Sequence, residues 1–167
     1  MKDVVIILGS DHGGFVLKEQ IRSYLQNADV IKNIHISNLI DVGTYGEQSC
    51  DYPDFVKKAV LIYKKFTYRF YFLGLRIRRK YRDDKVFIIL TCSSGAGVSM
   101  SENKKKYIRA LLCLKPEQAA LAREHNKANC ICFGQKFITF EEAKQSIELF
   151  LTSQFESGRH VRRISKM

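Results

Sequence analysis

The chain has 167 residues and a mass of 19.3 kDa, which fits one domain, or one domain with an appendage. Apolar residues make up 46% of it, enough for a hydrophobic core, and two prolines with ten glycines exclude a collagen or a Pro/Gly-rich linker. The net charge of +11 indicates an anionic partner: nucleic acid, a membrane surface or a phosphorylated metabolite.

The apolar run near the N-terminus is too short for a secretory signal and is more typical of a buried strand. No run approaches the roughly 18 apolar residues of a membrane span, so we expect a cytosolic protein. The five cysteines are an odd number without CxxC spacing, which predicts free thiols. We expect no metal site, because no second Cys or His pair has the spacing of zinc ligands.

Positive charge is concentrated in residues 64–85, which contain nine basic and two acidic residues. The basic character therefore belongs mainly to one segment.

In chain order, strand-like and helix-like patterns alternate. Residues 4–8 predict a strand and 15–26 a helix, 34–42 a strand and the residues from Pro53 a helix. Residues 86–91, 108–114 and 130–133 predict further strands, and 115–125 and 139–151 predict helices, the last with a capping box at Thr139 and Glu142.

Buried strands that alternate with helices predict an α/β fold, a doubly wound (Rossmann-like) three-layer sandwich with a five-stranded parallel sheet. We expect a single domain over residues 1–167, with the basic, aromatic-rich segment as an insertion. Ligands of such folds bind beyond the carboxyl ends of the strands. That edge would collect four segments: 10–12, 43–45 (which ends at Tyr45), 92–97 and 133–137.

Two of these segments have residues suited to chemistry. In GSDHGG, Asp11 and His12 either face a ligand or merely cap a helix. In TCSSGAGVS, small residues would leave backbone N–H groups free to bind an anion, and they would favour the thiolate of Cys92 as a base or nucleophile. The alternative is a buried cysteine at a tight turn.

Two further motifs lie towards the C-terminus. REHN contains His125 and Asn126 at the end of a predicted helix, where a simple cap is the alternative. GRHVRR places Arg159 and Arg163 four residues apart, so on a helix they could hold one phosphate together; a solvated basic tail is the alternative. Taken together, the four motifs suit proton transfer beside a carbonyl through an enediolate, a reaction that needs no metal or redox cofactor.

Six segments in this order closely resemble the ribose-5-phosphate isomerase type B family, which includes galactose-6-phosphate isomerase subunits: GSDHGGFVLKEQI, DVGTYGEQSCDYPDF, TCSSGAGVSMSENK, IRALLC, LAREHNKAN and FESGRHVRR. The resemblance covers nearly the whole chain except residues 64–85 and a small expansion near 29–36.

The resemblance implies a role for each matching position. It makes Cys92 the catalytic base and His125 the residue that opens the furanose ring, with Asp11 assisting. The other matching positions would bind substrate: His12, Tyr45, Ser93, Ser94, Gly95, Ala96, Gly97, Asn126, Lys136, Arg159 and Arg163. It also implies a homodimer, in some members a tetramer, in which the His-Asn pair reaches the site of the partner subunit.

The chain departs from the family pattern at three positions near the site. Ser93 replaces a glycine, and it would strain the loop by roughly 1–2 kcal/mol if that position needs a positive φ. Lys136 replaces an arginine and loses the bidentate fork for phosphate. Val98 stands where one subgroup has a glutamate base, so the chain resembles the subgroup with a cysteine base.

Residues 64–85 are a fourth departure. We interpret this segment as a lengthened helix and loop that packs on the body or on a neighbouring subunit, with a nucleic-acid or membrane-surface element as the alternative. A mispredicted stretch of gene is a third reading.

We therefore expect an isomerase of ribose 5-phosphate and ribulose 5-phosphate, an enzyme of the pentose phosphate pathway, with a phosphorylated sugar as its partner. The alternatives are a 6-phosphate hexose substrate (allose or galactose) and a decayed binding module of the same fold.

Overall fold

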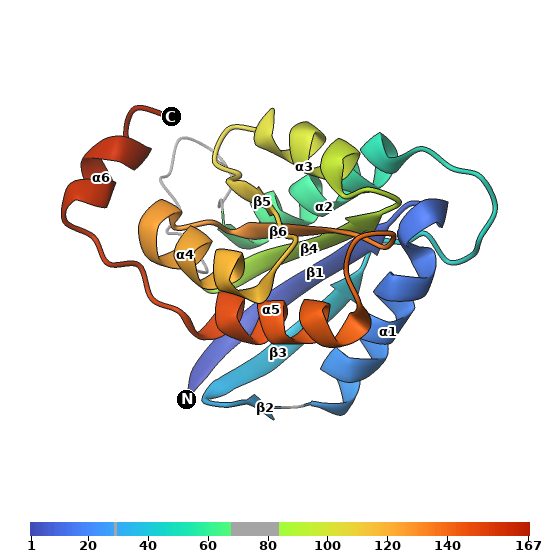
Figure 1. Cartoon of the computed structure of the whole chain (residues 1–167), viewed down its shortest axis with the longest axis horizontal. Coiled ribbons are helices and arrows are strands. Elements are labelled where there is room, and N and C mark those ends of the chain that lie inside the picture. The colour runs from blue at the N-terminus through green and yellow to red at the C-terminus, as the bar shows by residue number, and fades with distance from the viewer. Residues whose placement is uncertain (29, 68–83) are drawn as a thin grey trace, which may run out of the picture.

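The structure, a computed structural model, describes residues 1–28, 30–67 and 84–167. Within this part of the chain, six strands form one sheet in the order β2-β3-β1-β4-β6-β5 (Figure 1). The strands are β1 (Lys2–Ser10), β2 (Val30–Ile31), β3 (Ile34–Asp41), β4 (Val86–Cys92), β5 (Ala110–Leu112) and β6 (Cys130–Gly134). The helices are α1 (Phe15–Asn27), α2 (Tyr52–Thr67), α3 (Ala96–Asn103), α4 (Pro116–Asn126), α5 (Phe140–Thr152) and α6 (Arg159–Ile164), and the 3-10 turn η1 (His12–Gly14) precedes α1.

The predicted parallel sheet is confirmed. β1 pairs with β3 and β4, and β6 pairs with β4 and β5, all in parallel. β2 is an addition that the sequence did not indicate, because it has only two residues; it pairs antiparallel with the start of β3. The central strands β4 and β6 are buried throughout, as continuous apolar runs predict.

Helices cover both faces of the sheet, so the predicted three layers are confirmed. One core cluster joins α1, α4 and α5 to one face through residues such as Ile21, Ala119 and Ile147. A second cluster joins α2 and α3 to the other face through residues such as Val56 and Val98. The layers fix the strand ends in space, and those ends carry the candidate site.

Local signals also hold. Thr139 and Glu142 form the predicted capping box before α5: the Glu142 carboxylate accepts from the backbone N–H of Thr139 at 2.9 Å. All five cysteines are free thiols. Within the described ranges, no helix combines the length and apolar character needed to cross a membrane. Of the basic segment 64–85, residues 68–83 lie outside the described residues, so its predicted packing stays a prediction.

A buried carboxyl group stands out on α3. Glu102 has no exposed surface, and neither of its carboxylate oxygens has a hydrogen-bond partner among the residues that the structure describes. Burial raises the pKa of Glu102 from an ordinary value of 4.5 to about 8, only partly opposed by the charge of Lys105. Glu102 therefore keeps its proton in the folded chain at pH values where the unfolded chain has lost it.

We predict that Glu102→Gln removes a pH-dependent loss of stability. A folded-state pKa above the unfolded one makes the wild type lose stability as the pH rises from about 4.5 to about 8, and the loss is constant above that range. Thermal melts of both proteins at pH 5, 7 and 9 should show a gap that widens with pH, roughly 2–4 °C for each kcal/mol. An equal gap at all three values would contradict the assignment.

Candidate active site

The carboxyl edge of the sheet collects the loops that the sequence placed there. The loop after β3 is tied to the end of β1, since Ser10 donates its backbone N–H to the Gly43 carbonyl at 2.6 Å. The turn after β6 is tied to the loop after β4, since Lys136 donates its backbone N–H to the Ser93 carbonyl at 3.1 Å. Asp11, Tyr45, Cys92 and Lys136 thus belong to one edge of one chain.

Cys92 is the last residue of β4 and is 4% exposed. The backbone N–H of Gly95 donates to its Sγ at 3.0 Å. Negative charge on this sulfur would therefore face an amide dipole and lie close to the N-terminus of α3, where the helix dipole favours an anion. This arrangement suits a thiolate that accepts and returns a proton.

The loop after Cys92 places its positive φ on Gly95, at 76°, and not on Ser93. The strain that Ser93 would suffer at a positive φ therefore does not arise. The sequence analysis placed Ala96 and Gly97 in this loop, but in the structure they are the first two residues of helix α3. Ser94 is exposed, and its Oγ accepts weakly from the Ala96 N–H at 3.4 Å. The Gly95 amide is already directed at Cys92, so the predicted set of free amides is smaller than expected.

Asp11 and His12 follow β1 and take different positions. Asp11 is 7% exposed, and its carboxylate accepts from the Gly14 N–H at 3.1 Å, so it caps the turn η1. Burial is the main reason why the pKa of Asp11 is raised, against the opposing charge of His12. His12 is exposed and its Nδ1 lies 3.1 Å from the backbone nitrogen of Cys50. The capping reading holds for Asp11, yet its carboxyl still belongs to the edge that contains Cys92.

Tyr45 and Lys136 lie at the rim of this edge. The Tyr45 side chain is exposed, and its hydroxyl donates to the Asp41 carbonyl at 3.1 Å. Lys136 is exposed on the turn after β6. Both are free of the core and could turn towards a bound molecule.

A second group of predicted residues lies at the opposite edge of the sheet. His125 and Asn126 end α4, which leads into the amino end of β6, and Cys92 is paired with the carboxyl end of β6 at Gly134 (Figure 1). The first and last residues of β6 are four residues apart, about 13 Å at some 3.3 Å per residue. Arg159 and Arg163 share one face of α6, which packs on α4. Within one chain, the structure does not bring this group to Cys92.

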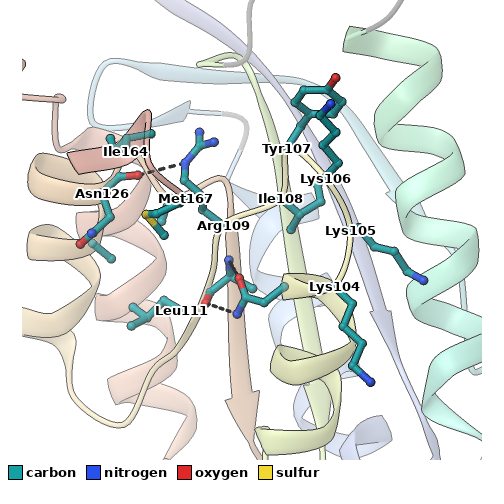
Figure 2. Close-up of a pocket in the computed structure, with 14 residues that line it drawn as sticks. Lys104, Lys105, Lys106, Tyr107, Ile108, Arg109, Leu111, Asn126, Ile164 and Met167 are labelled. Carbon is teal, nitrogen blue, oxygen red and sulfur yellow. Dashed lines mark hydrogen bonds between the residues drawn. The ribbon is translucent and has the colours of Figure 1, made fainter. Parts of the chain in front are cut away.

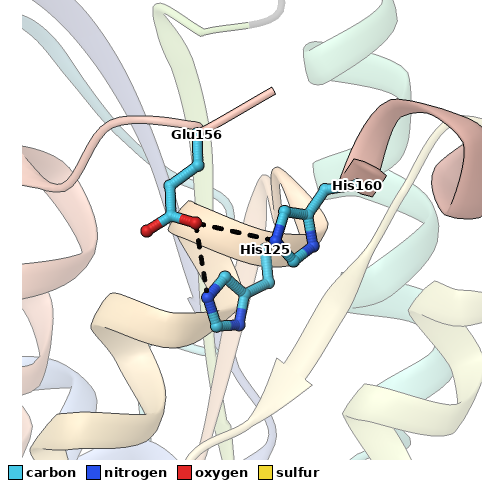
Figure 3. Close-up of side chains that lie close together, drawn as sticks. All are labelled: His125, Glu156 and His160. Carbon is cyan, nitrogen blue, oxygen red and sulfur yellow. Dashed lines mark ion pairs between the residues drawn. The ribbon is translucent and has the colours of Figure 1, made fainter. Parts of the chain in front are cut away.

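The second group includes partners that the sequence analysis missed. Glu156 Oε2 lies 3.6 Å from Nε2 of His125 and 3.6 Å from Nε2 of His160, and the two imidazole rings stack (Figure 3). Glu156 and His160 both lie in the segment FESGRH. A search for acidic residues and histidines from the motif REHN to the motif GRHVRR could have found them.

A groove of about 940 Å³ borders this group (Figure 2). Its lining includes Lys104, Lys105, Lys106, Asn126, Ile164 and Met167. Arg109, also in its wall, donates from Nε to the carbonyl of Asn126 at 3.0 Å and so fixes the end of α4. This hydrogen bond holds the backbone of Asn126, and not the side chains of the His-Asn pair.

Comparisons with known proteins agree with the motifs. The family model described as Ribose/Galactose Isomerase matches residues 6–167. Ribose-5-phosphate isomerase B of Escherichia coli is 32% identical over 95% of this chain and 91% of its own length, and the probable ribose-5-phosphate isomerase B of Mycoplasma genitalium is 36% identical over 97% and 92%. The chain therefore belongs to the ribose/galactose isomerase family, which confirms the predicted family and the assignment as an isomerase.

Solved structures give the same result. A ribose 5-phosphate isomerase from Thermotoga maritima superimposes with a TM-score of 0.80 at 37% identity, covering 98% of this chain and 96% of that one. The M. genitalium enzyme, solved with bound ribulose-5-phosphate, gives 0.78 at 35% identity, covering 99% and 94%.

We predict that Gly95→Ala disrupts the loop around Cys92. A methyl group there would lie 2.6 Å from Leu112 and 2.8 Å from the Gly134 nitrogen, on a backbone with φ of 76°. Isomerase activity should fall at least about 10-fold, and the melting temperature should drop by roughly 2–4 °C for each kcal/mol of strain. Gly46→Ala is the matched control, because its methyl group meets only the flexible side chain of Gln48. Equal behaviour of both variants would contradict the role given to Gly95.

Proposed function

We propose that the chain interconverts ribose 5-phosphate and ribulose 5-phosphate, as an aldose–ketose isomerase. The observation that carries the proposal is the buried Cys92 thiol at the end of β4, which receives the Gly95 N–H. The family membership and the relative solved with ribulose-5-phosphate support the substrate class.

In the proposed reaction the Cys92 thiolate removes the C2 proton of the open-chain aldose. The C–H electrons form the C1–C2 double bond of an enediolate while the C1 carbonyl electrons move to O1. The proton of the C2 hydroxyl passes to O1, the thiol returns its proton to C1, and the electrons left on O2 form the C2 carbonyl. Amide groups at the start of α3 and the Ser94 hydroxyl would stabilise the enediolate oxygens. Ser93, Ala96 and Gly97 would contribute through their backbone, and Gly95 through the N–H that it donates to the Cys92 sulfur.

Ring opening and phosphate binding are assigned to the remaining residues. His125 and Asp11 would exchange protons with the ring, with Asn126, His12 and Tyr45 contacting the sugar. Arg159 and Arg163, one turn apart on α6, would hold the phosphate, with Lys136 adding charge.

The proposed site needs two copies of the chain. Cys92 and His125 lie at opposite edges of one sheet, so they can meet only if the His125 edge of one protomer faces the Cys92 edge of another. A two-fold dimer would build two identical sites of this kind, each with residues from both chains.

We predict that Cys92→Ala retains sugar-phosphate binding but loses about 10²–10⁴-fold in turnover, the range for removal of a general base. Calorimetric titration with ribose 5-phosphate and a coupled isomerisation assay measure the two properties. Wild-type turnover in the variant would rule out Cys92 as the base.

We predict that two inactive variants restore activity when mixed. Cys92→Ala and His125→Asn would each lack an essential group, but a mixed dimer would contain one site with both groups intact. Random exchange should recover about a quarter of wild-type activity, because half of the dimers are mixed and half of their sites are complete. Each variant refolded alone is the control, and no recovery in a verified mixed dimer would contradict the shared site.

The hexose alternative is supported by the family description, which names both a ribose and a galactose isomerase. Rates with ribose 5-phosphate, allose 6-phosphate and galactose 6-phosphate would rank the sugars. Ser93 and the basic insertion were the two features that favoured a decayed binding module. Ser93 no longer favours it, because Ser93 does not occupy the positive-φ position.

A further inference from the structure

Glu156 lies between two histidines in the segment that leads into α6. Its Oε2 is 3.6 Å from Nε2 of His125 and 3.6 Å from Nε2 of His160 (Figure 3). The two rings are parallel within 1°, with centroids 4.5 Å apart. The His160 side chain is 6% exposed, whereas that of His125 is 36% exposed, so the buried ring forms a wall for the accessible one.

The backbone holds this arrangement in place. The N–H of Glu156 donates to the carbonyl of Glu124 at 3.0 Å, one residue before His125. Ser157 and Gly158 then take positive φ angles of 64° and 55°, which turn the chain into α6. The N–H of His160 closes this turn on the Ser157 carbonyl at 3.1 Å. The backbone of Glu156 is therefore attached to the helix whose histidine its carboxylate faces.

We propose that Glu156 is a positioning residue that holds His125 in the orientation and tautomer required to open the sugar ring. The inference rests on the proposed function, since it extends the role given there to His125. His160 stacks on the His125 ring and so fixes the plane of that ring.

The chemistry follows from the donor inventory. A carboxylate only accepts hydrogen bonds, so a neutral His125 that faces Glu156 through Nε2 has its proton on Nε2 and a free lone pair on Nδ1. A small movement would shorten 3.6 Å to a hydrogen bond. The carboxylate would also stabilise the positive charge that the ring acquires when Nδ1 accepts a proton.

The ring-opening step then balances. Nδ1 of His125 takes the proton of the anomeric hydroxyl, and the electrons of that O–H bond form the C1 carbonyl. The bond from C1 to the ring oxygen breaks, and the ring oxygen keeps the electron pair and takes a proton from Asp11 of the partner subunit. Burial raises the pKa of Asp11, which favours its protonated form.

A divalent metal ion is the competing occupant of this cluster, because its three ligand atoms lie within 4.8 Å of one another. The ring geometry disfavours it: an ion binds imidazole in the plane of the ring, and two stacked, parallel rings have no point in both planes. Arg159 and Arg163 also place positive charge close to the cluster, which opposes binding of a cation. Burial, the charge of His125 and these two arginines all lower the pKa of His160.

The test compares Glu156→Gln with the wild type on two aldose phosphates. Ribose 5-phosphate is mainly a closed ring, whereas erythrose 4-phosphate cannot form a five-membered ring because its C4 oxygen carries the phosphate. A positioning defect should therefore lower kcat/KM about 10-fold or more for ribose 5-phosphate and less than about 2-fold for erythrose 4-phosphate. Glu141→Gln, at an exposed position on α5, is the matched control and should leave both values unchanged.

A second readout separates position from folding. The ¹⁵N shifts of the His125 ring should report a proton on Nε2 in the wild type and a mixture of tautomers in Glu156→Gln, with unchanged melting temperature. Equal losses with both aldose phosphates, or no change in ring shifts, would overturn the proposal. So would stoichiometric uptake of Zn²⁺ by the chelator-treated wild type that is lost in Glu156→Gln.

Failure of the proposed function is a distinct outcome. If the wild type and Glu141→Gln turn over neither sugar, the isomerase assignment is wrong, and the role in ring opening is wrong with it.

Discussion

The polarity of a parallel sheet is the constraint on which the candidate site depends. All five parallel strands end at the same edge, so the loops after β1, β3, β4 and β6 meet there and surround Cys92. The same polarity sends the end of α4, with His125 and Asn126, to the other edge. In the proposed site, the residues of one chain therefore form two half-sites at opposite edges of the sheet, and we propose that a second copy of the chain completes each of them.

Close backbone contact around Cys92 is a second constraint. A methyl group on Gly14 would lie 2.4 Å from the backbone of Thr91, and one on Gly134 would lie 2.4 Å from the backbone of Ser94. Thr91 also donates its hydroxyl to the Gly14 carbonyl at 2.8 Å. The backbone of Gly14 packs on one side of the loop after β4, and the backbone of Gly134 packs on the other. These two contacts determine the direction in which the Gly95 amide points.

Most of the fold could be predicted from the sequence, because continuous apolar strands and capped, periodic helices are local signals. The two-residue strand β2 could not, since its pairing depends on β3. The residues of the carboxyl edge were predictable for the same reason that the sheet was: each follows a strand. The contact between Glu156 and His125 was not, because it depends on how the segment after α5 returns to α4, which no local pattern determines. The φ angle of Ser93 likewise depends on the neighbouring turn, in which Gly95 takes the positive value.

Lysine and arginine side chains stabilise the backbone near both groups of candidate site residues. At the carboxyl edge, Lys18 is fully buried and donates to Asp41 at 2.7 Å, and the other oxygen of Asp41 accepts from the Gly43 N–H at 2.8 Å, which sets the turn before Tyr45. At the amino edge, Arg109 and the buried Arg123 donate to carbonyls that follow α4, where the helix dipole is negative. Part of the basic character of the chain therefore stabilises the loops that present the candidate site. Arg159 and Arg163, by contrast, are exposed, and in the proposed function they bind the phosphate. The net charge alone could not distinguish residues that stabilise loops from residues that would bind phosphate, because lysines and arginines serve in both roles.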